Sequence, residues 1–188
     1  MRNRVIVNAK PKRITACLDH FKKLDNALCV SVNHTSQYKL VRLWFRLISR
    51  LGDGIFWYVV MAAILSTQGQ AGLQPVMHML LAGLTGTLLY KWLKSKTLRP
   101  RPYQVRQDIW LTGKPLDHFS FPSGHTLHAV VFSSVALAYF PSLAWLLIPF
   151  AVLVGMSRVI LGLHYPSDVV AGALLGALIA SLSMMIVF

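Results

Sequence analysis

The sequence predicts an all-α protein, a multi-pass bundle of about five transmembrane helices preceded by an N-terminal interfacial helix. Of the 188 residues, 55 % are hydrophobic and only 13 % are charged, whereas about a quarter of the residues in a soluble domain are charged. The mean hydropathy is +0.53. The apolar residues are gathered into runs that approach the length of a membrane span, which separates a membrane protein from an apolar soluble one.

Five apolar segments follow one another after residue 50, and each is expected to form a helix. A helix needs about 20 residues to cross the hydrocarbon core, and fewer when flanking side chains snorkel. The first and third segments are short, so their boundaries are the least certain. Glycine-rich stretches in the second and fifth segments offer small residues where helices can pack closely. The segments are residues 54–69, 73–93, 126–140, 143–162 and 168–188.

Residues 1–50 form a basic, partly amphipathic segment, and residues 51–188 are expected to form the membrane-embedded domain. Between Tyr38 and Arg50 the apolar side chains fall mainly along one helical face and the basic ones along the other. This pattern is typical of a helix that lies in the membrane interface. A helix that packs on the bundle without touching lipid would show the same pattern. Residues 52–54, Gly-Asp-Gly, then break the helix pattern.

The chain is strongly basic, with 19 Lys and Arg residues, six acidic residues and a net charge of +13. Such a balance suits anionic lipid headgroups or a phosphorylated substrate. Nucleic acid is not expected as a partner, because no groove-reading motif accompanies the basic residues. Chemistry that needs a carboxylate must use one of six aspartates, because the chain has no glutamate. They are Asp19, Asp25, Asp53, Asp108, Asp117 and Asp168.

Three polar clusters border the predicted spans. The first, residues 94–102, follows the second span; the second, residues 121–125, opens the third span; and the third, residues 157–168, joins the fourth and fifth. Successive spans run in opposite directions, so these three places lie on the same side of the membrane. The clusters are therefore expected to converge into one site.

Each cluster alone has an ordinary structural explanation, such as a headgroup anchor, a helix cap or a structural His–Asp pair. Together they contain what phosphoryl binding needs. Lys94, Arg101 and Arg158 can neutralise a phosphoryl group, and the planar fork of arginine suits its oxygens. The backbone N–H groups of Ser123 and Gly124, at a helix start, can bind an anion.

Two histidines add an acid and a nucleophile. His164 lies four residues before Asp168, so the carboxylate can fix the imidazole tautomer and free the other nitrogen for attack. His125 can act on the opposite side of the phosphoryl group. Two histidines and a carboxylate could also hold a metal, but the neighbouring Lys and Arg residues would repel a divalent cation. We expect no metal and no other cofactor.

The three clusters match, in order, the three-part signature of the type-2 phosphatidic acid phosphatase family, and the chain resembles this family over about residues 50–188. The matching motifs are Lys-x6-Arg-Pro (94–102), Pro-Ser-Gly-His (122–125) and Ser-Arg-x5-His-x3-Asp (157–168). The resemblance implies metal-independent hydrolysis of a phosphate ester or diphosphate. It implies that His164 attacks phosphorus and forms a phosphohistidine, that Asp168 orients it, and that His125 protonates the leaving oxygen and then activates water. It also implies that five residues hold the phosphoryl oxygens, namely Lys94, Arg101, Ser123, Gly124 and Arg158.

Several residues near the signature are set aside. His128 is expected to pack or to lie at the edge of the substrate, and His78 is expected to form a hydrogen bond inside the bundle. Asp117 and His118 lie close to the site in sequence but outside the signature.

The spans favour a lipid substrate, such as phosphatidate, phosphatidylglycerophosphate or a polyprenyl diphosphate, because its tails can stay in the bilayer. Membrane lipids are the other expected partners, and the sequence carries no sign of an oligomeric state. Two alternatives stay open: a lipid phosphotransferase that uses the same phosphohistidine, and a non-catalytic lipid-binding scaffold. A haloperoxidase shares related motifs, but the spans count against it.

The basic residues bear on which side of the plasma (inner) membrane the site faces. Eleven of the 19 Lys and Arg residues lie in residues 1–50, seven in 91–114, and the last is Arg158. With five spans, all of them fall on the side of the predicted site. The positive-inside rule then places the site in the cytoplasm. The family resemblance implies the opposite face, since many bacterial members are thought to work outside; the charge distribution favours the cytoplasm.

Overall fold

The computed structural model describes the backbone of residues 12–187 and the side chains of residues 16–187, so the first eleven residues of the basic N-terminal segment lie outside it. Within these residues every regular element is helical, which confirms the predicted all-α class. The long helices are α1 (Lys12–Asn33), α2 (Lys39–Arg50), α3 (Phe56–Gln68), α4 (Leu73–Thr97), α6 (Gly124–Tyr139), α7 (Ala144–Ile160) and α8 (Pro166–Val187). Short helical turns join them: η1 (His34–Gln37), η2 (Leu51–Ile55), η3 (Gly69–Gly72), α5 (Pro102–Val105) and η4 (Pro141–Leu143).

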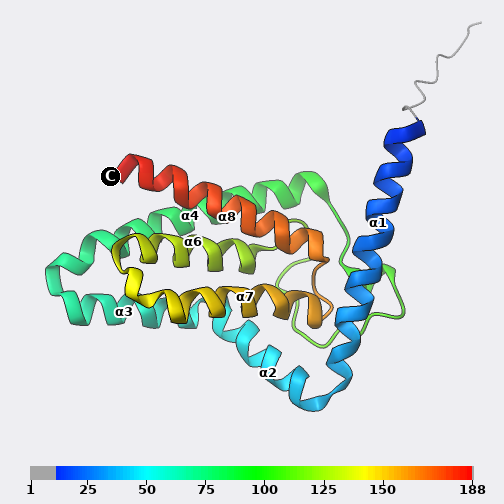
Figure 1. The fold of residues 1–188 in the computed structure, drawn as a ribbon, viewed down its shortest axis with the longest axis horizontal. Coiled ribbons are helices and arrows are strands. Elements are labelled where there is room, and N and C mark those ends of the chain that lie inside the picture. Colours follow the sequence, from blue (N-terminus) through cyan, green and yellow to red (C-terminus); the bar gives the residue numbers. More distant parts are fainter. Residues whose placement is uncertain (1–11, 188) are drawn as a thin grey trace, which may run out of the picture.

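Five helices, α3, α4, α6, α7 and α8, lie alongside one another and correspond to the five predicted segments (Figure 1). Among residues 12–187, three helical stretches are long and apolar enough to cross a membrane, namely Lys39–Thr97, Pro141–Ile160 and Pro166–Val187. Helix α6 has 16 residues, about 24 Å of helix, and it packs against α4, α7 and α8. The protein is therefore a multi-pass helical membrane bundle with α6 at its centre.

Two glycines of α8 allow this helix to lie directly against the backbone of α6. A Cβ atom on Gly172 would come within 2.5 Å of the carbonyl oxygen of Ser123, and one on Gly176 within 2.6 Å of the carbonyl oxygen of Leu127. Any larger residue would push the two helices apart. The predicted packing role of the small residues in α8 is thus confirmed, and the close approach brings the start of α8 to the start of α6.

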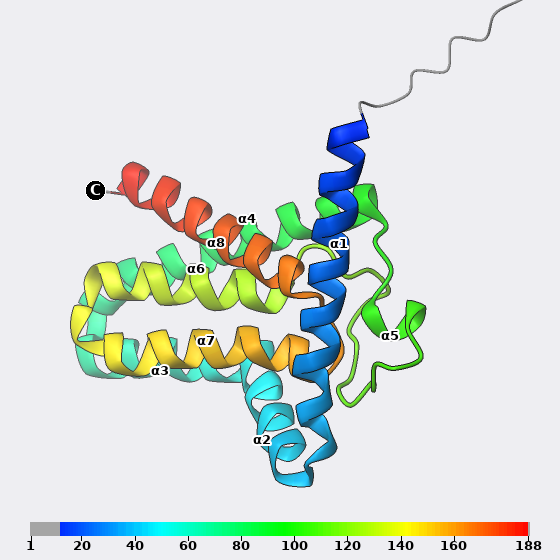
Figure 2. The same cartoon turned by 45° about the vertical axis from the view of Figure 1, so that its right-hand side comes forward.

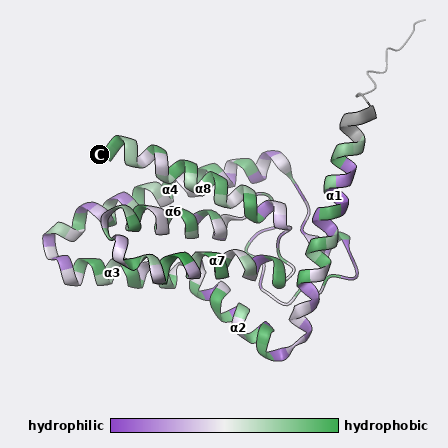
Figure 3. Cartoon of the chain, viewed as in Figure 1, coloured by the Kyte–Doolittle hydropathy of each residue, from purple (hydrophilic) through white to green (hydrophobic). Residues whose placement is uncertain are grey.

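The bundle has an apolar interior and an apolar exterior. Inside, Trp57 is 1 % exposed and contacts Phe56, Phe132 and Phe150. Outside, hydrophobic residues dominate α7 and α8 along their length (Figure 3). A large exposed apolar surface of this kind marks contact with a membrane. The exposed apolar side chains of α7 and α8 include Trp145, Ile148, Val152, Val170, Leu174 and Leu178.

Helix α1 crosses one end of the bundle at a steep angle to α7 and α8 in both views (Figures 1 and 2). This helix was not predicted from the sequence, in which residues 1–37 were identified only as part of a basic segment. The side-chain amide of Asn33 anchors the end of α1 by donating hydrogen bonds to the carbonyl oxygens of Ile160 (2.9 Å) and Trp110 (3.0 Å). Helix α1 thus becomes a fixed part of the bundle end where the polar clusters lie.

Helix α2 confirms the helix predicted between Tyr38 and Arg50. Ile48 and Ser49 are buried, and α2 packs against α7, while Leu40 and Leu43 on the other side are exposed. The helix thus packs on the bundle on one side and keeps an open apolar face on the other. At η2 the chain bends: Gly54 has a φ of 136°, which favours glycine, so α3 leaves in a new direction.

Candidate active site

A cavity of about 610 Å³ is lined in part by the long connection 98–123. Its wall combines residues from all three sequence clusters with residues of η2, α3 and α4. The alternation of span directions therefore does bring the clusters together, as the sequence predicted. The polar part of the wall includes Lys94, Arg101, Gly124, His125, Arg158 and His164.

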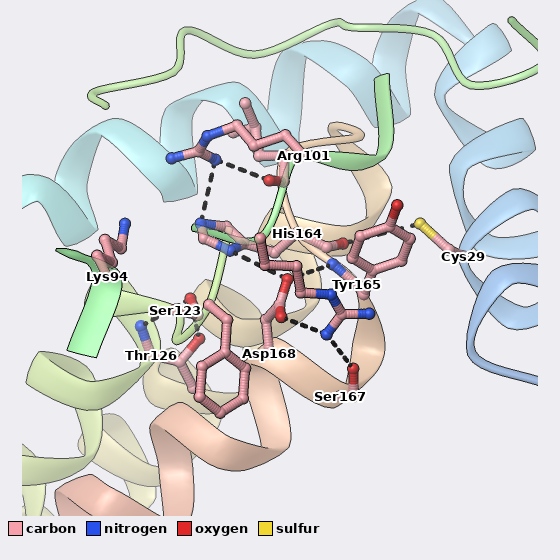
Figure 4. A network of polar contacts seen from close by, with 12 residues as sticks. Cys29, Lys94, Arg101, Ser123, Thr126, His164, Tyr165, Ser167 and Asp168 are labelled. Atoms are coloured by element: carbon pink, nitrogen blue, oxygen red, sulfur yellow. Dashed lines mark hydrogen bonds and ion pairs between the residues drawn. The ribbon is translucent and has the colours of Figure 1, made fainter. Parts of the chain in front are cut away.

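His164 is held in the turn between α7 and α8, and its side chain is 1 % exposed. The His164 N–H donates to the carbonyl oxygen of Arg158 (3.1 Å), and the Cys29 thiol of α1 lies 3.8 Å from the His164 carbonyl oxygen. Figure 4 shows the imidazole between Arg101 on one side and Asp168 on the other. Its ring is thus fixed by neighbours from several elements.

The two ring nitrogens of His164 have different surroundings. A guanidinium N–H of Arg101 lies 3.3 Å from Nε2 and can only donate, so Nε2 carries the lone pair. Nδ1 then carries the proton and faces the Asp168 carboxylate at 3.6 Å, somewhat beyond hydrogen-bond length. Burial, and then the charges of the nearby cations, hold the pKa of His164 well below its ordinary value. The imidazole is therefore neutral, with a lone pair available on Nε2.

Asp168 lies in the first turn of α8 and is completely buried. One carboxylate oxygen accepts the backbone N–H of Tyr165 (2.9 Å), and the other accepts a guanidinium N–H of Arg99 (2.7 Å). Arg99 also pairs with Asp25 of α1 at 2.8 Å and lies over the ring of Tyr165. A second layer of charged residues thus fixes the carboxylate that faces His164. Arg99 belongs to the first cluster but was not singled out as a site residue, and Asp25 was not predicted to lie here.

Arg158 is the most unusual cation of the site, because it is buried with two unpaired donor groups. Its side chain is held by Ser49 of α2 through Nη1. Within residues 16–187 its Nε and Nη2 have no hydrogen-bond partner. A buried donor without a partner costs free energy, and a buried charge without one costs more. The guanidinium is thus placed to take up an anion in the cavity.

Lys94 and Arg101 share a carboxylate that the sequence reasoning had set aside. Asp117, in the long connection, pairs with Lys94 at 2.6 Å and with Arg101 at 2.8 Å. Burial alone would raise the pKa of the Asp117 carboxyl, but the hydrogen bonds and charges of the two cations hold it below its ordinary value. An ionised carboxylate therefore lies against two of the three cations, where it fixes their side chains at the cavity.

The second cluster occupies the first turn of α6. The backbone N–H of Ser123 donates to the carbonyl oxygen of Asp168 (3.0 Å), and its hydroxyl lies 2.9 Å from that of Thr126. Ser123 therefore ties α6 to α8 and caps α6, and it is not among the residues that line the cavity. Gly124 does line it, in a helical turn whose N–H groups lack intrahelical partners. A phosphate-binding role of these two residues stays a prediction.

His125 lines the cavity next to Gly124, and its Nε2 contacts a carboxylate oxygen of Asp53 in η2. His78 is inside the bundle, as expected, and lies 3.0 Å from the Tyr139 hydroxyl. His128 lies 2.9 Å from the Thr87 hydroxyl and also lines the cavity, so a place at the edge of the substrate stays open for it.

The site includes no cluster suited to a metal. Among residues 16–187, no group of three or more His, Cys, Asp or Glu side chains is placed to hold a metal ion. Four Lys and Arg residues instead line the cavity, which is an arrangement for an anion; they are Lys91, Lys94, Arg101 and Arg158.

The sequence pattern of the PAP2 superfamily matches residues 75–188, which is more than half of the chain and includes all three clusters. The chain belongs to the PAP2 superfamily. As a PAP2 protein it is similar to an undecaprenyl-diphosphatase of Sulfolobus acidocaldarius, with 36 % identity over 142 residues, which cover 74 % of this chain and 67 % of the relative. Other named relatives match over 24–53 % of their own length.

Two solved structures share the fold of this PAP2 protein. The structure of LpxE from Aquifex aeolicus superposes with a TM-score of 0.73 and 28 % identity, covering 85 % of this chain and 93 % of that one. A transmembrane PAP2-type phosphatidylglycerolphosphate phosphatase from Bacillus subtilis gives a TM-score of 0.68 and 28 % identity, covering 89 % and 86 %. The matched family region begins at residue 75, so Asp25, Ser49 and Asp53 lie outside it.

Proposed function

We propose that the protein is a membrane phosphatase that hydrolyses a lipid phosphate monoester or diphosphate through a phosphohistidine on His164. The observation that carries this proposal is the arrangement at the polar end of the cavity. A neutral, buried imidazole presents Nε2 beside Arg101, and Arg158 adds a guanidinium with unpaired donors. Phosphoryl transfer depends above all on positioning and on neutralising the charge of the phosphoryl oxygens.

The first half of the reaction transfers the phosphoryl group to the enzyme. Nε2 of His164 attacks phosphorus with its lone pair, and the bond between phosphorus and the leaving oxygen breaks. His125 gives its proton to that oxygen, and the alcohol or lipid phosphate leaves. Lys94, Arg101 and Arg158 balance the charge on the phosphoryl oxygens, while Asp168 stabilises the charge that develops on the His164 ring.

The second half releases phosphate. His125, now neutral, takes a proton from a water molecule as the water oxygen attacks the phosphorus of the phosphohistidine. The bond between phosphorus and Nε2 breaks, and its electron pair returns to His164. Inorganic phosphate leaves and both histidines regain their starting states. No metal takes part in these steps.

The shape of the cavity supports a lipid as the substrate. From its polar end the cavity continues along α3 and α4, where its wall is apolar. Tyr58, Leu80 and Leu84 belong to this wall and are also exposed on the outside of the bundle. A headgroup at the polar end could therefore keep its tails between α3 and α4, at the edge of the bilayer. The names of the relatives, an undecaprenyl-diphosphatase and a phosphatidylglycerolphosphate phosphatase, support the same class.

The proposal is tested by measuring phosphate release from purified protein in detergent. The substrates are phosphatidate, phosphatidylglycerophosphate and a polyprenyl diphosphate, each with EDTA, with vanadate or with neither. We expect release from at least one lipid, no loss with EDTA, and inhibition by vanadate, which mimics a phosphoryl group. Loss of activity with EDTA would contradict the metal-independent mechanism. A phosphorylated acceptor lipid in place of free phosphate would instead identify a phosphotransferase.

The direction that the site faces is a separate part of the proposal. Helices α1 and α2 and the long connection, which carry most of the basic residues, lie at the site end of the bundle. This distribution favours a site on the cytoplasmic side of the plasma membrane. A reporter fused at residue 1 of an active protein is expected to be cytoplasmic. Exposure of that reporter on the external side would contradict this orientation.

A further inference from the structure

Asp53 lies in the bend between α2 and α3. The turn η2 is a kink between these two helices, and Gly54 within it has a positive φ of 136°. Glycine adopts such a φ without steric cost, so the chain can change direction here. Here the bend carries Asp53 away from the axis of α3 and toward the start of α6. The Gly-Asp-Gly sequence thus does more than end a helix.

The carboxylate of Asp53 contacts His125, although the two residues are 72 positions apart. One Asp53 oxygen lies against Nε2 of the imidazole, and both side chains line the cavity. The His125 side chain is 10 % exposed and that of Asp53 is 36 % exposed. The contact is therefore at the cavity wall, beside the groups that would act on phosphorus.

Burial and the nearby cations act against a positive charge on His125. Burial of the imidazole, and then the charge of Arg158 in α7, lower the pKa of His125, and His128 of α6 acts in the same direction. Lys94 and His164 also line the cavity. Asp53 is the carboxylate that contacts the His125 ring among the described residues. A carboxylate beside an imidazole favours its protonated form.

We propose that Asp53 is a positioning residue for His125, which favours the protonated form of this histidine against burial and Arg158 and orients it toward the leaving oxygen. The proposal rests on the phosphatase function and adds a dependence on the leaving group. When a lipid monoester is cleaved, the departing alkoxide is strongly basic and needs the proton of the His125 imidazolium. When the leaving group is weakly basic, as a nitrophenolate or a lipid phosphate is, it can depart with little proton transfer. Asp53 therefore matters most for substrates with basic leaving groups.

Asp53→Asn tests this inference, because the amide keeps the shape of the side chain and removes its charge. With phosphatidate in detergent micelles we expect kcat to fall about 100-fold, within the range for a general acid. With p-nitrophenyl phosphate in the same micelles the fall should be less than about 10-fold. Without the carboxylate, His125 loses its proton at lower pH, so the basic limb of the phosphatidate pH profile should move to lower pH. Asp108→Asn, at an exposed carboxylate paired with Arg106, is the matched control. It should change neither the kcat values with the two substrates nor the pH profile.

A double-mutant cycle separates positioning from folding. In a His125→Asn background, Asp53→Asn should cause no further loss with phosphatidate, because Asp53 acts through His125. Asp53→Ser, with a smaller side chain, repeats the measurement if the amide disturbs the turn. Equal losses on both substrates with an unmoved pH limb, or full additivity with His125→Asn, would overturn the inference. The phosphatase proposal would survive that result as long as His164→Ala is inactive; an active His164→Ala variant would overturn the proposal itself.

Discussion

Replacing His164 by alanine is expected to lower phosphate release from the lipid substrate by at least about 10⁴-fold, since loss of a nucleophile removes the whole covalent route. The substitution removes Nε2, the nitrogen that faces Arg101. The phosphate-binding cations stay in place, because Arg101 is also held by Asp117 and by the carbonyl oxygen of Leu163. The variant should therefore still bind vanadate or phosphate while turning over no substrate. Phosphate release and vanadate protection against thermal unfolding, both in detergent, measure the two properties.

The matched control for this variant is His118→Ala. His118 is exposed, lies next to Asp117 in the chain and does not line the cavity. Its replacement should leave phosphate release unchanged. If His164→Ala retained substantial turnover in the same preparation, His164 would not be the nucleophile.

Arg158→Met should lower activity and leave the fold equally or more stable. Removal of one preorganised donor that stabilises transition-state charge typically costs about 10²–10³-fold in rate. In the resting protein, however, the buried guanidinium has two donor atoms without partners. Replacing such a charge with an apolar side chain of similar size is often neutral or stabilising. This combination, less activity with unchanged or higher stability, is the signature of a group kept for function.

Phosphate release and thermal unfolding in detergent check this prediction together. Arg106→Met is the control, because Arg106 pairs with Asp108 at the surface and its loss should change neither measurement appreciably. A lower unfolding temperature for Arg158→Met with full activity would mean that Arg158 supports the fold and not the reaction.

The helices of the bundle were predictable from the sequence, because long apolar runs mark their positions. The segment predicted at 73–93 is α4, which extends four residues further to Thr97, and the segment predicted at 126–140 is α6, which begins two residues earlier at Gly124. Polar residues at these ends, such as Lys94 and His125, belong to helices that reach the site. Because the spans were predicted from apolar residues alone, the predicted helices were too short at the ends that reach the site.

The convergence of the three clusters was also predictable, because it follows from the alternating direction of the spans. The partners that hold the site were not predictable, since they pair across long sequence distances. Asp25 of α1 pairs with Arg99, and Asp117 of the long connection pairs with Lys94 of α4. A local pattern does not contain such contacts.

Two signals could have drawn attention to these missed elements. In α1 the apolar residues Leu18, Phe21, Leu24 and Leu28 recur every three or four positions, as on one face of a helix. The second signal is the scarcity of acids in a chain with a net charge of +13. Carboxylates that are so few among so many cations tend to be paired. Four of the six aspartates contact residues in or next to the site, namely Asp25, Asp53, Asp117 and Asp168.

The central claim, that a phosphoryl group is carried on His164, is tested most directly by trapping the intermediate. Purified protein is mixed rapidly with a lipid substrate whose transferred phosphoryl group carries a phosphorus label. The reaction is quenched in base, and the protein is digested for peptide mapping. We expect label on the peptide that contains His164, stable in base, released in acid and absent from His164→Ala. Phosphate released at the full rate with no label on His164 at any quench time, or with label on another residue, would contradict the claim.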